Sequence, residues 1–483
     1  MGKRKHIWLI IADQMRADAM GVENKKVQTP VLDKLAAEGT VFTNAYCASP
    51  VCTPSRASIM TGRYPNVHGA WNIGVSLRED EVTLCDSLKE LGYRTVGVGK
   101  MHFRPQCKTG FTAEAEEVSV RDRGRERDGT YFGFDEHHIS EDNMVGEYIE
   151  WLRRQDSAVA ERFVRDQYRS GDAVRDVWES DIPPHLHQSY WMAEKSIEQI
   201  DKHDVEQPLF LWTSFVDPHH PFNPPRAYAE QYTDVDIPIP EAQQGEFKLR
   251  PEHLQRQGER GYWPGGGEAH QLDRAHLQRV IRNYYAMITF MDEQIGRINE
   301  AWKARGLDDE LVIVFTSDHG ELLGDHGLMY KGPWFYEGLT RIPMIIRVPE
   351  GTDKKVSALM EHVDIAPTLL DIIGAAIPYG IQGVSQRPVV EGLEAAVRTS
   401  AITTYDAHDR GIQAQCLRTN RYKLVLFAGE TYGELYDLEV DAEERQNVFF
   451  DPAYQAAKLQ LLELLAERLI QEQDPLPERK ALW

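Results

Sequence analysis

The sequence has few cysteines. Five occur in 483 residues, and their spacing matches no metal-binding motif. An odd number leaves at least one thiol without a partner in the chain, which fits a reducing compartment better than an oxidising one. We therefore expect a cytoplasmic protein, unless a leader precedes this sequence. The five are Cys47, Cys52, Cys85, Cys107 and Cys416.

The sequence also lacks long hydrophobic runs and an excess of positive charge. No stretch is long enough to cross a membrane, and the apolar stretch after His6 is too short for a secretory signal. The net charge of −22 argues against nucleic acid as a partner and against long-range attraction of a highly sulfated polymer. We therefore expect no membrane and no nucleic-acid partner, and local basic side chains must attract any anionic ligand.

Strand-like and helix-like segments alternate through most of the chain. Short apolar runs predict buried strands, and amphipathic periodicity predicts helices. The pattern predicts an α/β fold with a large, mixed but mostly parallel sheet that is covered by helices on both faces. Two charge-rich, irregular regions, 104–190 and 224–270, are expected to form insertions that wall a site. The predicted strands include 7–12, 94–96, 209–213 and 311–315, and the predicted helices include 29–38, 84–91 and 272–303.

The pattern changes near residue 380. Three segments with alternating character follow, at 412–417, 422–427 and 433–438, and an amphipathic helix is predicted at 453–471. The chain is too long for one small core. We therefore predict a catalytic domain over residues 1–380 and a smaller α+β subdomain over 381–483, with a small antiparallel sheet and a closing helix.

The string C-T-P-S-R at residues 52–56 is the most informative stretch of the chain. Pro54 can open a helix, and Arg56 lies one turn into it. Cys52 would then sit where helix N–H groups and a guanidinium meet an anion. An isolated C-x-P is usually a buried free cysteine, but the full string C-T-P-S-R-A-S-I-M-T-G-R is far more specific.

Polar side chains follow two of the predicted strands. Asp13 and Gln14 come directly after the first strand, and Asp318 and His319 follow the strand at 311–315. Parallel strands can bring such residues together at one edge of the sheet. A bound cation is the most direct way to offset the charge of an anionic ester. The sequence therefore predicts a metal site at this edge.

These motifs resemble those of the type I sulfatases of the alkaline phosphatase superfamily, in which this cysteine is oxidised to a formylglycine whose hydrated aldehyde attacks sulfur. The resemblance implies hydrolysis of a sulfate monoester and a maturation enzyme that forms formylglycine from Cys52. Gln14 and His319 resemble the choline-sulfatase-like and phosphonate monoester hydrolase branches. Calcium is the expected metal, with manganese, zinc and magnesium as alternatives because His and Gln soften the site. The implied metal ligands are Asp13, Gln14, Cys52, Asp318 and His319.

The resemblance also implies roles for the charged residues near the site. Arg56 and Lys100 would balance charge on the sulfuryl oxygens, and Asp318 would take the proton of the nucleophile. Histidine and lysine side chains would act at the two leaving groups, and an amide matched by spacing alone would bind the anion. These are His102 for sulfate release, His219 and Lys331 for the departing alcohol, and Asn72 for the anion.

Two alternatives remain open at this stage. A phosphonate monoester or phosphodiester hydrolase would use the same residues, although that branch has neutral hydroxyl residues where this chain has Lys100 and His102. A non-catalytic anion or carbohydrate binder would result if Cys52 stayed unmodified. The sequence is compatible with a homo-oligomer, and it does not identify the sulfated small molecule or oligosaccharide. Candidates for its pocket are His68, Trp71, Tyr405, His408 and Arg410.

Overall fold

The structure is a computed structural model. It describes residues 5–105, 131–142, 146–167, 177–241, 250–252, 254–255, 274–349, 351 and 353–475. Cys107 and parts of the two predicted insertions lie outside the described residues.

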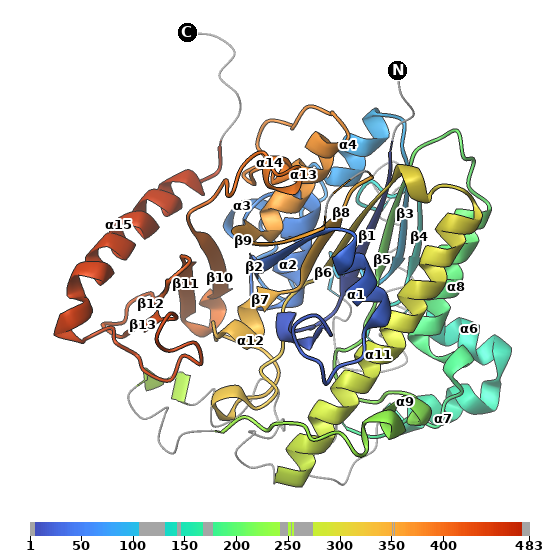
Figure 1. Cartoon of the computed structure of the whole chain (residues 1–483), viewed down its shortest axis with the longest axis horizontal. Helices are drawn as coiled ribbons and strands as arrows, with labels where there is room; N and C mark the ends of the chain where they lie inside the picture. Colours follow the sequence, from blue (N-terminus) through green and yellow to red (C-terminus); the bar gives the residue numbers. More distant parts are fainter. Residues whose placement is uncertain are drawn as a thin grey trace.

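Within the described residues, nine strands form one large sheet in the middle of the molecule (Figure 1). They are β1 (His6–Ala12), β2 (Thr40–Tyr46), β3 (Arg94–Gly99), β4 (Glu136–Ile139), β5 (Leu209–Ser214), β6 (Leu311–Ser317), β7 (Arg341–Ile342), β8 (Met344–Arg347) and β9 (Lys354–Glu361). Their order is β4–β3–β5–β1–β6–β8–β2–β7, and β9 pairs with β2. The run from β4 to β6 is parallel, whereas β8 and β7 are antiparallel to their neighbours. The predicted mixed, mostly parallel sheet is confirmed.

Strand β1 shows why both faces of this sheet are covered. Ile7 and Ile11 pack in one hydrophobic cluster, while Trp8 and Ile10 pack in another. Successive side chains of a strand point to opposite faces. Because all seven residues of β1 are buried, each face needs a layer of helices.

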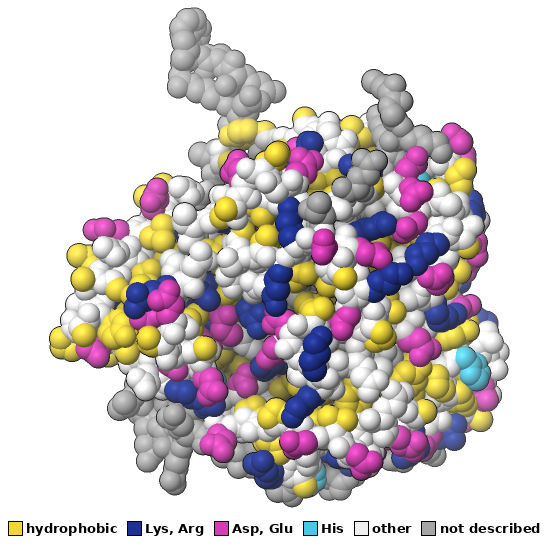
Figure 2. Space-filling model, in the orientation of Figure 1, with side chains coloured by type: hydrophobic (Ala, Val, Ile, Leu, Met, Phe, Trp, Pro, Cys, Tyr) yellow, Lys and Arg dark blue, Asp and Glu magenta, His cyan; other side chains and the backbone are white. Residues whose placement is uncertain are grey.

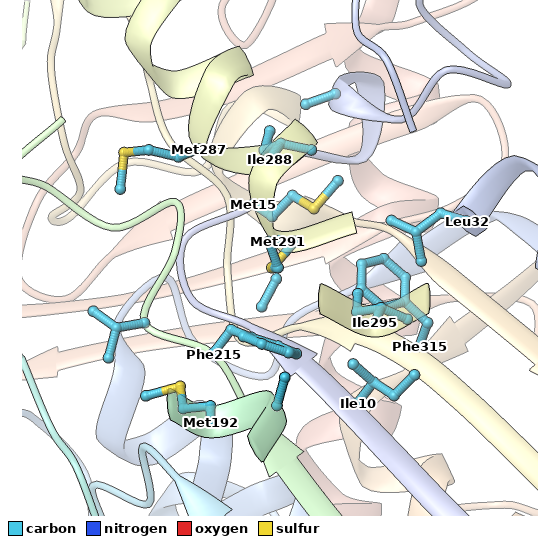
Figure 3. Packing of buried hydrophobic residues seen from close by; sticks show 14 of the residues in the cluster. Ile10, Met15, Leu32, Met192, Phe215, Met287, Ile288, Met291, Ile295 and Phe315 are labelled. Atoms are coloured by element: carbon cyan, nitrogen blue, oxygen red, sulfur yellow. The ribbon is translucent and has the colours of Figure 1, made fainter. Parts of the chain in front are cut away.

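Helices from distant parts of the chain supply these two layers. One layer contains α1 (Pro30–Ala37), α6 (Glu147–Gln155), α7 (Ser157–Gln167), α8 (Gln188–Asp201), α9 (Arg226–Ala229) and the long α11 (Arg274–Ala304). The other contains α2 (Cys52–Thr61), α3 (Pro65–His68), α4 (Leu84–Glu90), α13 (Ile365–Ile372) and α14 (Arg387–Val390). In Figure 3, Met291 and Ile295 of α11 lie beside Ile10 and Phe315 of the central strands. Their spacing of four residues places them on one face of the helix.

A second, antiparallel sheet follows α12 (Glu337–Thr340) and the last strands of the large sheet. It consists of β10 (Ala401–Ala407), β11 (Ile412–Arg418), β12 (Tyr422–Phe427) and β13 (Gly433–Asp437), paired in chain order. The closing helix α15 (Gln455–Gln471) packs Leu461 and Leu465 against Leu417 and Leu424. The predicted small sheet and closing helix are confirmed, β10 is an additional strand, and the boundary at residue 380 stays a prediction.

The prediction that residues 104–190 are irregular is wrong for its described part. This part contains β4, α6, α7 and the start of α8. In α6, Tyr148, Ile149 and Leu152 are buried while the charged side chains face outward. The region was therefore predicted to be irregular because of its many charged residues, although its few apolar residues have the spacing of a helix.

The described surface carries charges of both signs. Figure 2 shows Lys and Arg interspersed with Asp and Glu over one face, with hydrophobic side chains gathered at the α15 end. Phe450, Leu459 and Ile470 are among the exposed hydrophobic residues. None of the described helices is long and apolar enough to span a bilayer. Homo-oligomerisation stays a prediction.

Candidate active site

Four neighbouring parallel strands end at one edge of the large sheet and deliver polar residues there. Asp13 follows β1, Asp318 follows β6 and Lys100 follows β3. His219 lies on the loop after β5. The carboxyl ends of parallel strands are the usual place for a ligand site in an α/β sheet. The structure therefore brings together residues that are up to three hundred positions apart in the chain.

Cys52 is the first residue of α2 and is buried among these side chains. Its Sγ atom lies 3.1 Å from His319 Nε2 and 2.9 Å from Lys331 Nζ. Burial, and then the charge of Asp13, raises the pKa of the thiol to about 12. A neutral thiol is a poor nucleophile, so the cysteine itself is not suited to attack an ester at neutral pH.

Cys52 and three other potential metal ligands lie close together. One ligand atom each of Asp13, Cys52, Asp318 and His319 lies within 4.8 Å of the others. His319 Nδ1 contacts the carbonyl oxygen of Gly320 at 2.8 Å. That contact assigns the proton to Nδ1 and leaves the lone pair of Nε2 directed at the cluster, as in a histidine that binds a metal.

Gln14 completes the set of oxygen donors. Its Nε2 donates to the buried carboxylate of Glu321 and lies 3.3 Å from His220 Nδ1. These contacts orient the amide, and Oε1 has no hydrogen-bond partner among the described residues. Leaving a buried oxygen without a partner is costly. Two carboxylates, an amide oxygen and an imidazole therefore fit a divalent cation.

Arg56 and Lys100 bring positive charge to the same space. Arg56 Nε donates to Asp318 Oδ2 at 2.8 Å, and Nη1 donates to Ser214 Oγ at 2.7 Å. Lys100 Nζ lies 2.6 Å from Asp13 Oδ2. Burial alone would raise the pKa of Asp13, but Lys100 and other nearby cations hold it well below its usual range. Asp13 is therefore ionised.

His219 and Lys331 form a pair beside Cys52. Lys331 Nζ donates to His219 Nε2 at 3.0 Å, and His219 Nδ1 contacts the carbonyl oxygen of His220 at 2.6 Å. Burial, with the charge of His220 and Lys331, lowers the pKa of His219 well below its usual range. His219 therefore holds the Lys331 amine in place as a neutral imidazole, and Lys331 is the member of the pair that can supply a proton.

His102 lies two residues after Lys100, with its backbone in the left-handed region at φ 55°. Its backbone N–H donates to Glu141 Oε1 at 2.9 Å. Its buried ring nitrogen Nδ1 has no hydrogen-bond partner in the part of the chain that the structure describes. Burial, and then Lys100, lowers its pKa to about 3. It is a neutral imidazole with one ring nitrogen that makes no hydrogen bond to the described residues.

The structure does not place every predicted residue at this cluster. Asn72 donates to the carbonyl oxygen of Asp406 at 2.5 Å, a contact with β10, so its role in binding an anion stays a prediction. His68 is fully buried and hydrogen-bonded to Ser58 of α2, and its role in the substrate pocket stays a prediction. The rings of Trp71 and His408 contact each other at a tilt, with 4.2 Å between centroids, Tyr405 is buried and Arg410 is exposed; their roles stay predictions.

Sequence reasoning missed several residues of the site. Asp142 pairs with Lys100, Glu141 holds the loop of His102, Ser214 holds Arg56, and Glu321 orients Gln14. Asp142 follows β4, whose sequence E-H-H-I has no apolar alternation that would mark a strand. Glu321 is three residues after Asp318, and this short distance in the sequence could have marked it as a residue of the site.

The family profiles cover nearly the whole chain. The profile of the sulfatase family matches residues 5–375. That of the C-terminal region of N-sulphoglucosamine sulphohydrolase matches residues 324–472.

Individual proteins match over similar lengths. The chain is 30% identical over 477 residues to an arylsulfatase of Clostridium perfringens (strain 13 / Type A), covering 96% of this chain and 94% of the relative. It is 27% identical over 521 residues to an N-acetylglucosamine-6-O-sulfatase of Bacteroides thetaiotaomicron, covering 99% and 88%. Its structure resembles the phosphonate monoester hydrolase of Agrobacterium radiobacter with a TM-score of 0.83 and 28% identity, covering 98% and 96%. The chain therefore belongs to the sulfatase family and is a sulfuric ester hydrolase.

Proposed function

We propose that this enzyme hydrolyses the sulfate monoester of a carbohydrate or of another small alcohol, with residue 52 acting as a formylglycine. The observation that carries the proposal is the placement of Cys52 at the start of α2, within 3.1 Å of His319 and 2.9 Å of Lys331. A thiol with a pKa of about 12 needs activation. Oxidation by a maturation enzyme supplies a hydrated aldehyde, whose hydroxyl is the nucleophile.

The metal site would be built from Asp13, Gln14, Asp318 and His319, together with residue 52. The unpartnered Oε1 of Gln14 and the orientation of His319 Nε2 support this assignment. Calcium is the first candidate, and manganese, zinc and magnesium are alternatives. When bound, the cation supplies Lewis-acid stabilisation of negative charge on the reacting groups.

The side chains around the metal ligands handle charge and protons. Arg56 and Lys100, both fully buried, offset the charge on the sulfuryl oxygens. Asp318 takes the proton of the attacking hydroxyl. Lys331, 3.0 Å from His219 Nε2, supplies a proton to the departing alcohol. The neutral His102 then accepts a proton as sulfate leaves.

A second candidate is hydrolysis of a phosphonate monoester, because the similarity to the Agrobacterium radiobacter phosphonate monoester hydrolase is high. Lys100 and His102 favour sulfate over this alternative, since a cation beside a neutral imidazole that can accept a proton suits release of sulfate. The relative named as an N-acetylglucosamine-6-O-sulfatase supports sulfated sugars as the substrate class.

The test combines a mass measurement with a substrate screen. The enzyme is produced together with a formylglycine-generating enzyme, and mass spectrometry of the peptide with residue 52 measures the conversion of cysteine to formylglycine. Turnover is then compared for sulfated monosaccharides, choline sulfate, sulfated glycosaminoglycan fragments and 4-nitrophenyl phenylphosphonate. We expect modified protein that prefers sulfate esters. Full activity with an unmodified Cys52, or faster turnover of the phosphonate ester than of every sulfate ester, would overturn the proposal.

A further inference from the structure

Asp142 is a site carboxylate that belongs to none of the motifs carrying the proposed function. It lies three residues beyond the end of β4, on a segment that hydrogen bonds hold firmly. Gln188 Nε2 donates to the carbonyl oxygen of Glu141 and to Ser140 Oγ, each at 2.8 Å. Glu141 Oε1 in turn accepts the N–H groups of the loop that carries His102. The position of Asp142 is therefore built into the fold.

Asp142 shares Lys100 with the metal-ligand candidate Asp13. Lys100 Nζ lies 2.5 Å from Asp142 Oδ1 and 2.6 Å from Asp13 Oδ2. One ligand atom each of Asp13, Asp142 and His219 lies within 4.8 Å of the others. Lys100 and Asp13 are fully buried, whereas 30% of the Asp142 side chain is exposed. Asp142 is thus the most exposed of these charges.

The carboxylate of Asp142 changes the charge that an incoming ester meets. Among the described residues, three cationic side chains, three carboxylates and Cys52 form one network of close contacts, and Glu141 and Glu321 lie beside it. Without Asp142, the site would be more positive by one unit. The cations are Arg56, Lys100 and Lys331, and the carboxylates are Asp13, Asp318 and Asp142.

The repulsion between the Asp142 carboxylate and an ester depends on the charge of the ester. A sulfate monoester or a phosphonate monoester carries one negative charge, whereas a phosphate monoester carries two above its second pKa of about 6. By Coulomb's law, the repulsion from a nearby carboxylate doubles when the charge of the ligand doubles. A carboxylate a few ångströms from the sulfuryl site therefore penalises dianions more than monoanions.

We infer that Asp142 is a specificity-determining residue that selects singly charged esters over doubly charged phosphate monoesters. This inference rests on the proposed function and adds to it the class of ester that the site rejects. It gives Asp142 a role beyond holding Lys100. A residue that only positioned Lys100 would support all esters alike, because each presents oxygens to the same ammonium.

The test uses three substrates with one leaving group: 4-nitrophenyl sulfate, 4-nitrophenyl phenylphosphonate and 4-nitrophenyl phosphate, compared at about pH 8, where only the last is a dianion. In Asp142→Asn, we expect kcat/KM for the phosphate to rise about tenfold relative to both monoanions, even though absolute rates fall. Inhibition by inorganic sulfate, a dianion, should tighten by a similar factor. Asp142→Glu keeps the charge and should keep the wild-type ratios.

Asp135→Asn is the matched control, because Asp135 is also partly exposed but pairs with Lys89 of α4 at 3.0 Å. It removes the same formal charge outside the cluster and should leave the ratios unchanged. If Asp142→Asn lowers kcat/KM for all three substrates by the same factor, Asp142 is only a positioning residue and the inference fails. Should Asp142→Asn not fold, Asp142→Ala gives the same comparison. The phosphate-to-phosphonate ratio tests the charge effect even if sulfate turnover, and with it the proposed function, fails.

Discussion

Two clusters of buried arginine and carboxylate groups lie in this molecule, and they differ in how completely their atoms are satisfied. The site cluster contains Asp13, Arg56, Lys100 and Asp318 at the edge of the large sheet. The interdomain cluster contains Tyr64, Glu361, Asp364, Arg398 and Arg468, and it joins the large sheet to the C-terminal sheet and α15. Both are buried, so burial of charge alone does not distinguish them.

The interdomain cluster is saturated with partners. Glu361 accepts hydrogen bonds from Tyr64 OH at 2.9 Å and from Ile402 N at 2.6 Å, and it pairs with both Arg398 and Arg468. Burial alone would raise the pKa of Glu361, but the two arginines hold it below its usual range. Such a network fixes the second sheet against the first and leaves no capacity for a ligand.

The site cluster keeps unused hydrogen-bonding atoms. Among the described residues, Gln14 Oε1, Arg56 Nη2 and His102 Nδ1 are buried without a hydrogen-bond partner. An unsatisfied buried polar atom is costly in a folded protein. The comparison teaches that unused hydrogen-bonding atoms, and not shifted pKa values, mark the functional cluster, because the pKa of Glu361 is shifted as well.

The largest effect on turnover is expected when the Cys52 side chain, which the site cluster surrounds, is removed. Cys52→Ala should lower sulfatase turnover by about 10⁴-fold or more, because the nucleophile is lost. The fold should survive, since the change removes one sulfur atom from a helix start. Turnover and thermal unfolding are measured side by side. Cys52→Ser should not rescue activity, because a plain hydroxyl cannot reform an aldehyde. Near-wild-type turnover of Cys52→Ala would contradict the proposed mechanism.

The next largest effect is expected at the metal ligands. Asp318→Asn should lower turnover by about 10³-fold, because it removes a charged ligand and the base for the nucleophile. It should also reduce the metal content measured by elemental analysis. Chelation of the wild-type enzyme should abolish activity, and a divalent cation should restore it. Active enzyme without a stoichiometric divalent cation would show that Asp13, Gln14, Asp318 and His319 do not form a metal site.

In the interdomain cluster, the expected effect is on stability. Glu361→Gln should lower the free energy of unfolding by about 3 kcal/mol, because two buried arginines lose their carboxylate. Because the pKa of Glu361 is lowered on folding, its contribution is present above the unfolded pKa and is lost as the pH falls through the folded one. The stability difference from wild type should therefore shrink in acid.

Urea unfolding at neutral and acid pH measures this difference, and Glu463→Gln on the exposed side of α15 is the matched control. The folded variant should keep its turnover number. A Glu361→Gln protein that is as stable as the control would contradict the structural role of the interdomain cluster.

The two clusters also differ in what the sequence could predict. Asp13, Lys100 and Asp318 follow strands with apolar runs, so their shared edge could be predicted from parallel pairing. The interdomain cluster draws on Glu361, Arg398 and Arg468, which look like ordinary surface charges in the sequence until the two sheets are packed. Asp142 was missed for a related reason, because β4 is a polar edge strand without a recognisable pattern.

The catalytic roles themselves stay predictions, because proximity does not order the steps of a reaction. The fold class could be predicted since strand and helix periodicity are local properties. The helices α6 and α7 were missed, because charged residues outnumber the few apolar ones that pack inward.

The smallest predicted effect separates the two halves of the reaction within the site cluster. His102→Ala should slow turnover by about 10²-fold, a typical loss for one general base. Because His102 is assigned to sulfate release, ester cleavage should slow less than release. Stopped-flow measurement with 4-nitrophenyl sulfate should then show a burst of nitrophenolate equal to the enzyme concentration, followed by slow turnover. Lys331→Ala, which affects the departing alcohol, should slow the first turnover and show no burst. Equal slowing of both phases in His102→Ala would assign the proton of the release step to another group.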